Sequence, residues 1–209
     1  MIVKKLLSII KSLIIIQSKL NICEFLEQKE TPINCVLHNL KYSNEYLYAS
    51  NNIFTTGIIN VKNPNHNIYI VPDKSVDDFS KLKWTIKQTD QTNGTITIRS
   101  NKDEYLCASN LYHDLFQQRR RVYLKANSNK KSIIDNVINR NCEWRLEQSI
   151  GQIYIIWNDF YNEPLYAPSF FYKYNSIKRY VYLWKKKPTT STSSPEYKWF
   201  IDCSKNGHH

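Results

Sequence analysis

The heptapeptide NEYLYAS at residues 44–50 returns as DEYLCAS at 103–109 and as NEPLYAP at 162–168. The interval is 59 residues both times (103 − 44 = 59 and 162 − 103 = 59). Glutamate, leucine and alanine keep their places in all three copies. A fixed period of this length indicates repeated supersecondary units. The sequence therefore predicts three structural repeats.

Three other short patterns recur around each heptapeptide. They are an alternating run before it (35–40, 94–99 and 152–157), a second run after it (67–71, 121–125 and 180–184), and a Trp-x-aliphatic step that closes the repeat (84–86, 144–146 and 199–201). Runs of this kind, bounded by Asn, Asp, Ser, Lys and Pro, are typical of strands between turns. Successive strand side chains point to opposite faces, so one tryptophan per repeat (Trp84, Trp144 and Trp199) is predicted to be buried.

Three repeats of four strands make twelve strands, and closing them into a barrel would remove exposed sheet edges. In this respect the sequence resembles the β-trefoil, an all-β fold in which three pseudo-threefold repeats form a six-stranded barrel capped by three hairpins. The resemblance covers residues 35–204, with repeats at about 35–91, 92–151 and 152–204. A helix-and-sheet fold and an array of three domains are the alternatives. Repeats this short, without a clear helical period, argue against both.

Within the β-trefoil superfamily, three motifs make the chain similar to secreted insect proteins. They are EYLCAS at 104–109, RRRVYL at 119–124 and EWRLE at 143–147. The families concerned are the thirty-kilodalton haemolymph lipoproteins and the salivary trefoil proteins of blood-feeding flies. The resemblance implies a secreted protein.

A hydrophobic leader precedes the repeats. Residues 1–23 begin with Lys4 and Lys5 and continue with a mostly apolar run from Leu6 to Ile16, which fits a signal peptide. Lys11 interrupts that run, so an amphipathic N-terminal helix is the alternative. The run is too short and too charged for a membrane span. We therefore expect secretion without stable membrane insertion.

The cysteine count agrees with an oxidising compartment. Removing a leader that contains Cys23 would leave four cysteines, an even number that allows two disulfides. Reduced, buried thiols are the alternative. In a closed barrel the first and last strands are antiparallel neighbours, so Cys35 and Cys203 come within bridging distance. We expect this disulfide and a second one between Cys107 and Cys142.

Signatures of enzymes are missing from the sequence. HExxH, CxxC, GxSxG and phosphate-binding loop motifs do not occur, and the 4 glycines leave little room for glycine-rich loops. His38, His66 and His113 are isolated, and no pair of carboxylates stands out. We therefore expect no enzymatic activity, no cofactor and no metal ion.

The sequence also argues against a galactose site of the ricin type. Ricin-type lectins carry Q-x-W in each repeat, whereas here Leu82, Cys142 and Tyr197 stand two residues before the tryptophans. Asp114 and Asp159 are candidates for a different sugar site, or are ordinary acids in turns.

The basic residues give the candidate binding site. The net charge is +11, which favours anionic ligands. Arg119, Arg120 and Arg121 precede the third strand of the second repeat, and Lys178 and Arg179 stand in the same register in the third. Both groups belong to capping hairpins, and arginine suits phosphate, sulfate or carboxylate. The alternative is a solvated charged turn that serves solubility.

An aromatic segment follows the third heptapeptide. It reads FFYKYN at 170–175, and we expect Phe171 and Tyr172 to be exposed at a hairpin tip as part of the site. The alternative is a tip that folds back over the mouth of the barrel.

These observations favour a secreted, monomeric binding protein that holds an anionic or carbohydrate ligand. A sulfated glycan, a nucleotide or a lipid head group would suit the site, and nucleic acid is not expected. A role against host defence in saliva, with a host or haemolymph protein as a further partner, is the first hypothesis. The alternatives are a haemolymph storage or lipid-carrier protein and an intracellular trefoil scaffold.

Overall fold

The computed structural model describes residues 33–53, 65–90, 94–114, 118–126, 140–169, 177–185 and 194–203. The expected leader at 1–23, Phe171 and Tyr172 lie outside these ranges. The described elements are strands and short 3-10 helices. The strands are β1 (Ile33–Asn39), β2 (Glu45–Ile53), β3 (His66–Pro72), β4 (Lys83–Asp90), β5 (Thr95–Ser100), β6 (Glu104–Asp114), β7 (Arg119–Ala126), β8 (Trp144–Ile150), β9 (Ile153–Asn158), β10 (Glu163–Tyr166), β11 (Arg179–Tyr180), β12 (Tyr182–Trp184) and β13 (Lys198–Asp202). The 3-10 helices are η1 (Asp73–Ser75), η2 (Phe79–Leu82), η4 (Arg140–Cys142) and η6 (Pro195–Tyr197).

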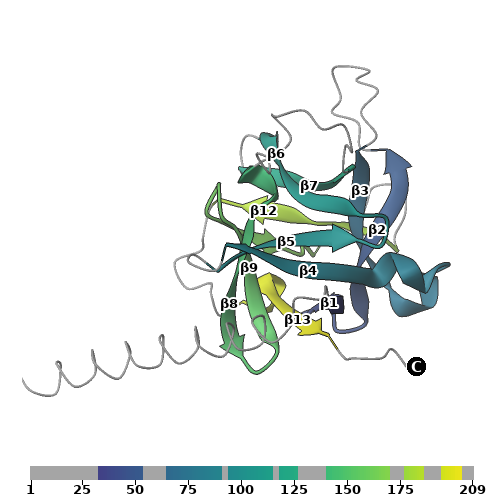
Figure 1. Cartoon of the computed structure of the whole chain (residues 1–209). Helices are drawn as coiled ribbons and strands as arrows, with labels where there is room; N and C mark the ends of the chain where they lie inside the picture. Colours follow the sequence, from purple (N-terminus) through teal and green to yellow (C-terminus); the bar gives the residue numbers. More distant parts are fainter. Residues whose placement is uncertain are drawn as a thin grey trace, which may run out of the picture. The chain divides into compact units, whose positions relative to one another are not determined.

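Six strands close into a barrel (Figure 1). Going round it, β1 pairs with β4, β4 with β5, β5 with β8, β8 with β9, β9 with β13, and β13 with β1, always antiparallel. The first and last strands of the described chain are therefore neighbours, as the closed arrangement requires.

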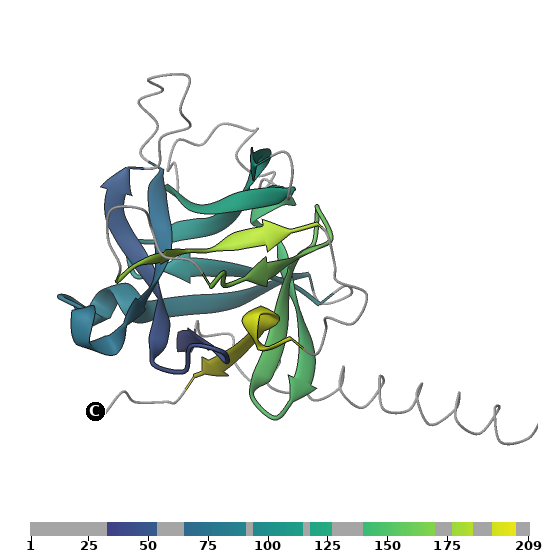
Figure 2. The same cartoon turned by 180° about the vertical axis from the view of Figure 1, so that it is seen from behind.

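The other strands form three hairpins that cap the barrel (Figure 2). These are β2–β3, β6–β7 and β10–β12. The second strands of the hairpins also pair with one another, β3 with β7, β7 with β12, and β11 with β3. The described strands number thirteen, against the twelve expected, because Val181 divides the second strand of the third hairpin into β11 and β12.

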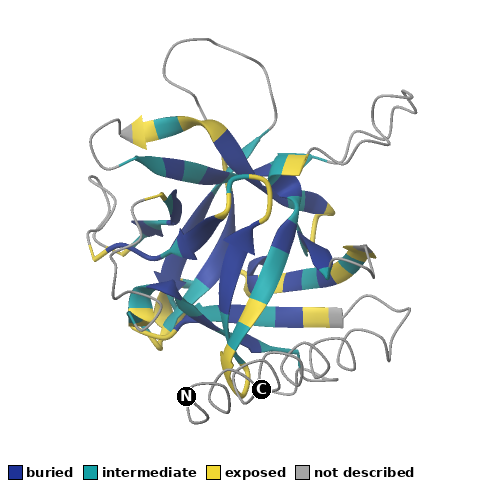
Figure 3. Ribbon diagram, turned by 90° about the vertical axis from the view of Figure 1, so that its left-hand side faces the viewer, coloured by how far each residue is buried: buried dark blue, intermediate teal, exposed yellow. Residues whose placement is uncertain are grey.

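The three tryptophans that close the predicted repeats lie at the centre of the core. Trp84, Trp144 and Trp199 are each 0% exposed, as predicted. Each indole Nε1 donates a hydrogen bond to a leucine carbonyl oxygen, at 3.0 Å to Leu47, 2.8 Å to Leu106 and 3.1 Å to Leu165. The acceptors are the leucines of the three heptapeptides. Each buried indole thereby has a partner and joins one hairpin to the barrel. Buried residues recur along the strands of the barrel and of its cap (Figure 3).

The first residue of the heptapeptide lies in the turn before a strand. Asp103 and Asn162 have φ of 58° and 50°, in the left-handed region. Asn and Asp tolerate this conformation better than other residues with a side chain. In the second and third repeats, Asp or Asn at this place therefore meets a backbone requirement.

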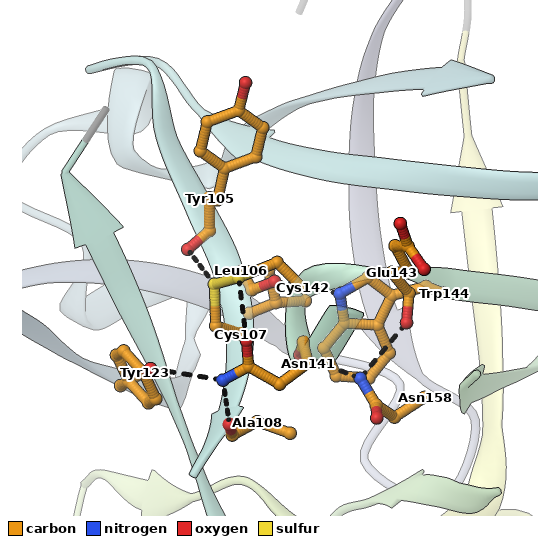
Figure 4. Close-up of a disulfide and its surroundings, with 10 residues drawn as sticks. All are labelled: Tyr105, Leu106, Cys107, Ala108, Tyr123, Asn141, Cys142, Glu143, Trp144 and Asn158. Carbon is orange, nitrogen blue, oxygen red and sulfur yellow. Dashed lines mark hydrogen bonds between the residues drawn. A yellow bond between two sulfur atoms is a disulfide. The ribbon is translucent and has the colours of Figure 1, made fainter. Parts of the chain in front are cut away.

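Both expected disulfides are present. Cys35 on β1 is bonded to Cys203, which follows β13, and Cys107 on β6 is bonded to Cys142 in η4. Beside the second bridge, the Asn141 amide donates to the carbonyl oxygen of Ala108 at 2.7 Å (Figure 4). The first disulfide joins neighbouring barrel strands, and the second ties the segment before Trp144 to a capping hairpin.

Candidate functional site

Two of the five cations predicted to bind a ligand are buried, and each of the two pairs with a glutamate. Arg120 and Arg179 are each 7% exposed. Arg120 Nε donates to Glu163 Oε2 at 2.9 Å. Arg179 binds Glu45 with two hydrogen bonds, Nε to Oε2 at 2.7 Å and Nη2 to Oε1 at 3.1 Å. Both guanidinium groups are therefore used to hold the fold together.

Backbone and aromatic contacts complete the surroundings of both arginines. Arg120 Nη1 donates to the carbonyl oxygen of Asn110 at 2.9 Å, and its guanidinium lies 3.8 Å from the centre of the Tyr161 ring. Arg179 Nη1 donates to the carbonyl oxygen of Ser169 at 2.6 Å. Burial raises the pKa of the Glu163 carboxyl, and the charge of Arg120 opposes that rise.

A third pair stands at the equivalent place in the remaining hairpin. Leu47, Leu106 and Leu165 pair in register with Ile70, Leu124 and Leu183. Counting back four residues from those partners gives His66, Arg120 and Arg179. His66 Nδ1 lies 2.5 Å from Glu104 Oε1. Each of the three glutamates is thus matched to a basic side chain of the preceding repeat, and the three pairs link the repeats in a closed circle.

The other three predicted cations lie on the outer face of the cap. Along β7, Arg120, Val122 and Leu124 are buried, so Arg119 and Arg121 point to the opposite face and are partly exposed. Lys178, just before β11, is also partly exposed.

Each of these three cations lies against a tyrosine ring. Arg119 lies 5.3 Å from the centre of the Tyr182 ring, and Arg121 lies 5.0 Å from that of Tyr180. Lys178 Nζ lies 5.6 Å from the centre of the Tyr69 ring. We call Arg119, Arg121, Lys178, Tyr180 and Tyr182 the cation–aromatic face.

Strand pairing brings the cation–aromatic face together. Tyr182 is opposite Arg121 in the β7–β12 register, and Tyr180 is opposite Tyr69 in the β3–β11 register. The His113 ring stacks on Tyr182 with 5.3 Å between centres, and its Nδ1 accepts a hydrogen bond from Arg121 Nε at 3.1 Å. Tyr182 and Tyr69 are buried beneath the cations. Tyr180 is partly exposed beside Arg121, so positive charge lies next to one accessible ring. An anionic group attached to a ring fits that chemistry.

Of the two aspartates considered for a sugar site, Asp114 stands opposite Arg119 in the β6–β7 register. Asp159 is exposed in the turn after β9, with Oδ1 3.4 Å from Arg145 Nε. That position fits an ordinary turn acid. Asp114 is the last residue of β6.

Within the described ranges, no group of three or more His, Cys, Asp or Glu residues is placed to hold a metal ion. The same part of the chain contains no helix long and apolar enough to cross a membrane.

The ion pairs of the buried arginines have a counterpart in the sequence, a shared interval between the glutamates and the arginines. Glu45, Glu104 and Glu163 recur at the interval of 59 residues, and Arg120 and Arg179 recur at the same interval (179 − 120 = 59). Charges of opposite sign that share one period are expected to pair at equivalent positions. The pairing joins different repeats, so neighbourhood in the sequence does not show it.

No family model matches the chain, and no curated protein matches its sequence. Among solved structures it is similar to a salivary protein of the mosquito Culex quinquefasciatus from the cysteine- and tryptophan-rich family, with a TM-score of 0.54 and 16% identity over 83% of this chain and 95% of that one. It is similar to the ricin B-like lectin of Macrolepiota procera in complex with lactose, with a TM-score of 0.52 and 16% identity over 85% and 99%. It is also similar to the designed threefold-symmetric protein ThreeFoil, with a TM-score of 0.53 and 11% identity over 81% and 97%. Together with the closed barrel and its cap of hairpins, these likenesses show that the chain is an all-β protein with the β-trefoil fold, which it shares with salivary proteins of a mosquito.

Proposed function

We propose that this chain is a secreted, non-enzymatic binding protein that holds an anionic glycan on the cation–aromatic face. The observation that carries the proposal is the set of three partly exposed cations, Arg119, Arg121 and Lys178, each held against a tyrosine ring on adjoining strands. A sulfated sugar offers an anion for the cations and a ring for Tyr180, which is partly exposed. A nucleotide or a lipid head group shares the anion and is the next candidate.

Two further observations support the proposal. The lectin of the same fold was solved in complex with lactose, which makes a carbohydrate a natural first ligand to test. Two disulfides suit an extracellular protein, because thiols stay reduced in the cytosol, and salivary proteins share the fold. The ligand-bound protein would act as a monomer, by sequestration in saliva, with a host protein as a further partner.

Storage or lipid transport in haemolymph is the second candidate. The net charge of +11 and the tyrosine-rich composition also suit an abundant protein whose surface has no defined site. An intracellular scaffold is the third, and an intact N-terminus in the native protein would favour it.

The test compares two triple variants on a heparin column. The first, R119S/R121S/K178S, removes the cations of the cation–aromatic face. The control, K74S/K83S/K87S, removes the same charge from exposed positions on η1 and β4. We expect the first variant to elute at clearly lower salt than the control. Contacts between exposed charges are screened beyond about 8 Å at physiological ionic strength, so only a local cluster should produce the difference.

Equal elution of the two triple variants would overturn the proposed site and favour storage or transport. Calorimetry with ATP then distinguishes a compact anion from a polymer, since a nucleotide held by arginine forks should depend on geometry more than on salt. Recovery of the glycan with unchanged mass after long incubation tests the non-enzymatic part of the proposal.

A further inference from the structure

A second group of aromatic residues lies where the third repeat meets the first. The Tyr166 ring is 5.0 Å from both the Trp184 and the Tyr197 rings, and the last two are nearly parallel, at 14°. Lys41, in the turn after β1, pairs with Glu196 in η6. Tyr42 follows Lys41, and the charge of Glu196 acts on both Tyr166 and Tyr197. We call Lys41, Tyr42, Tyr166, Trp184, Glu196 and Tyr197 the aromatic–hydroxyl cluster.

Two hydroxyl groups of this cluster are buried without a hydrogen-bond partner. They belong to Tyr42 and to Tyr197, whose residue is 3% exposed. Hydroxyls elsewhere on the cap are partnered: Tyr48 donates to Asp77 Oδ1 at 3.0 Å, and Tyr123 accepts from Asn141 at 3.4 Å. Burying a hydroxyl without a partner is unfavourable, and each such group in a folded protein calls for an explanation.

The fold itself does not require these hydroxyls. In the second repeat the positions equivalent to Tyr166 and Tyr197 are Cys107 and Cys142, which form a disulfide. In the first repeat they are Tyr48 and Leu82, which belong to a buried apolar cluster. The same place in the barrel and cap is therefore filled in two other ways that leave no hydroxyl unpaired. Phenylalanine at 197 would fill the third place without an unpaired group.

We propose that the aromatic–hydroxyl cluster is a binding site for a neutral, hydroxyl-bearing ring compound the size of a monosaccharide. The half-buried rings of Tyr166 and Trp184 supply a flat apolar surface, and the hydroxyls of Tyr42 and Tyr197 supply the polar contacts that fix orientation. Lys41 and Glu196 neutralise each other within the cluster, so no net charge is asked of the ligand.

The protonation state of the tyrosines fits this role. Burial raises the pKa of Tyr166 and of Tyr197, and the charge of Glu196 raises both further. Both phenols therefore keep their protons at neutral pH, and each offers a donor as well as an acceptor. Sugar hydroxyls need both. The aromatic–hydroxyl cluster and the cation–aromatic face share no residue, and they meet where Arg119 stands opposite Trp184 in the β7–β12 register.

The test is isothermal titration calorimetry of the full chain with galactose, glucose and N-acetylglucosamine. The variant Y42F/Y197F removes both unpaired hydroxyls and keeps the rings, and Y105F on β6 is the matched control. We expect the wild type and Y105F to bind one of the sugars alike. In Y42F/Y197F we expect a loss of about tenfold in affinity, which is the effect of about 1.4 kcal/mol.

A stability measurement on the free proteins completes the test. Y42F/Y197F should unfold at a temperature equal to or above that of the wild type, because two unsatisfied polar groups are gone. Wild type that binds none of the three sugars, or equal affinity for the variant, would overturn the inference. A lower unfolding temperature would show that the hydroxyls serve the fold through bound water, and would also overturn it. The variant R121S/K178S, which leaves Arg119 in place opposite Trp184, should bind the sugar normally, so failure of one site is distinguishable from failure of the other.

Discussion

One hydrogen bond, from an indole to a leucine carbonyl, is made three times in the core. Trp84, Trp144 and Trp199 all make it with full burial. A tryptophan removed here leaves a large cavity and an unpaired carbonyl oxygen, whereas Trp184 on the cap is only partly buried.

We expect W144A to lower the free energy of unfolding by about 3–5 kcal/mol. Urea denaturation measures it, with W184A as the comparison at the surface of the cap. W84A and W199A should fall in the same range, because their surroundings are equivalent. A cost for W144A no larger than that of W184A would contradict this view of the core.

The same residue type has opposite roles at neighbouring positions of β7. Arg119 is partly exposed beside Tyr182, whereas Arg120 is buried against Glu163. Truncating Arg120 would leave the buried carboxylate of Glu163 without its partner. Truncating Arg119 would remove a partly exposed charge and would not affect that buried pair. Only the position of the residue on the strand separates the two outcomes.

At the scale of elements, the salt bridge between Arg120 and Glu163 joins the β6–β7 hairpin to β10. We expect R120A to cost about 3–5 kcal/mol at pH 7, because breaking a buried ion pair leaves a charge uncompensated. The matched control R119A should stay within about 0.5 kcal/mol of the wild type. Urea denaturation of both variants gives the comparison, and similar values for the two would contradict the burial of Arg120.

The loss of unfolding free energy in R120A should also depend on pH. Without the guanidinium that lowers it, the pKa of Glu163 in the folded state rises further above the ordinary value of 4.5. The unfolded state then binds fewer protons than the folded one between these two pKa values, so stability falls as pH rises through that window. The difference between R120A and wild type should therefore shrink as pH falls from 7 towards 4.5, and a difference that grows would exclude this cause.

How well the sequence predicts these elements depends on how far apart along the chain the interacting residues lie. Leu47, Leu106 and Leu165 repeat because each must fill one place under one tryptophan, so their period predicted the strands and the buried core. The disulfide of Cys35 followed from closure of the barrel. The burial of Arg120 and Arg179 did not follow, because it depends on glutamates 43 and 134 residues away in other repeats. The aromatic–hydroxyl cluster has no period, since each repeat fills that place differently.

At the scale of the whole molecule, the two disulfides constrain very different lengths of chain. Cys35 and Cys203 are 168 residues apart, and Cys107 and Cys142 are 35 apart. The loss of chain entropy in the unfolded state grows with the length of the closed loop, to about 5 kcal/mol for the first bridge and about 4 kcal/mol for the second.

We therefore expect C35S/C203S to lower the free energy of unfolding by more than C107S/C142S. Denaturation of both variants under non-reducing conditions measures the difference, and wild type in excess reductant is the reference for loss of both bridges. The reverse order would show that the tie between η4 and the cap contributes native contacts that outweigh the longer loop.

The bridge between the first and last barrel strands also decides how the protein responds to a mechanical load. A tension applied at attachment points before Cys35 and after Cys203 passes through the sulfur–sulfur bond. Apart from Ile33 and Asn34 at the start of β1, the barrel strands and hairpins lie within the loop that this bond closes and bear none of the pull. Under oxidising conditions the trefoil would stay folded at forces that tear hydrogen-bonded strands apart, and adding a reductant would transfer the whole load to the sheet at once.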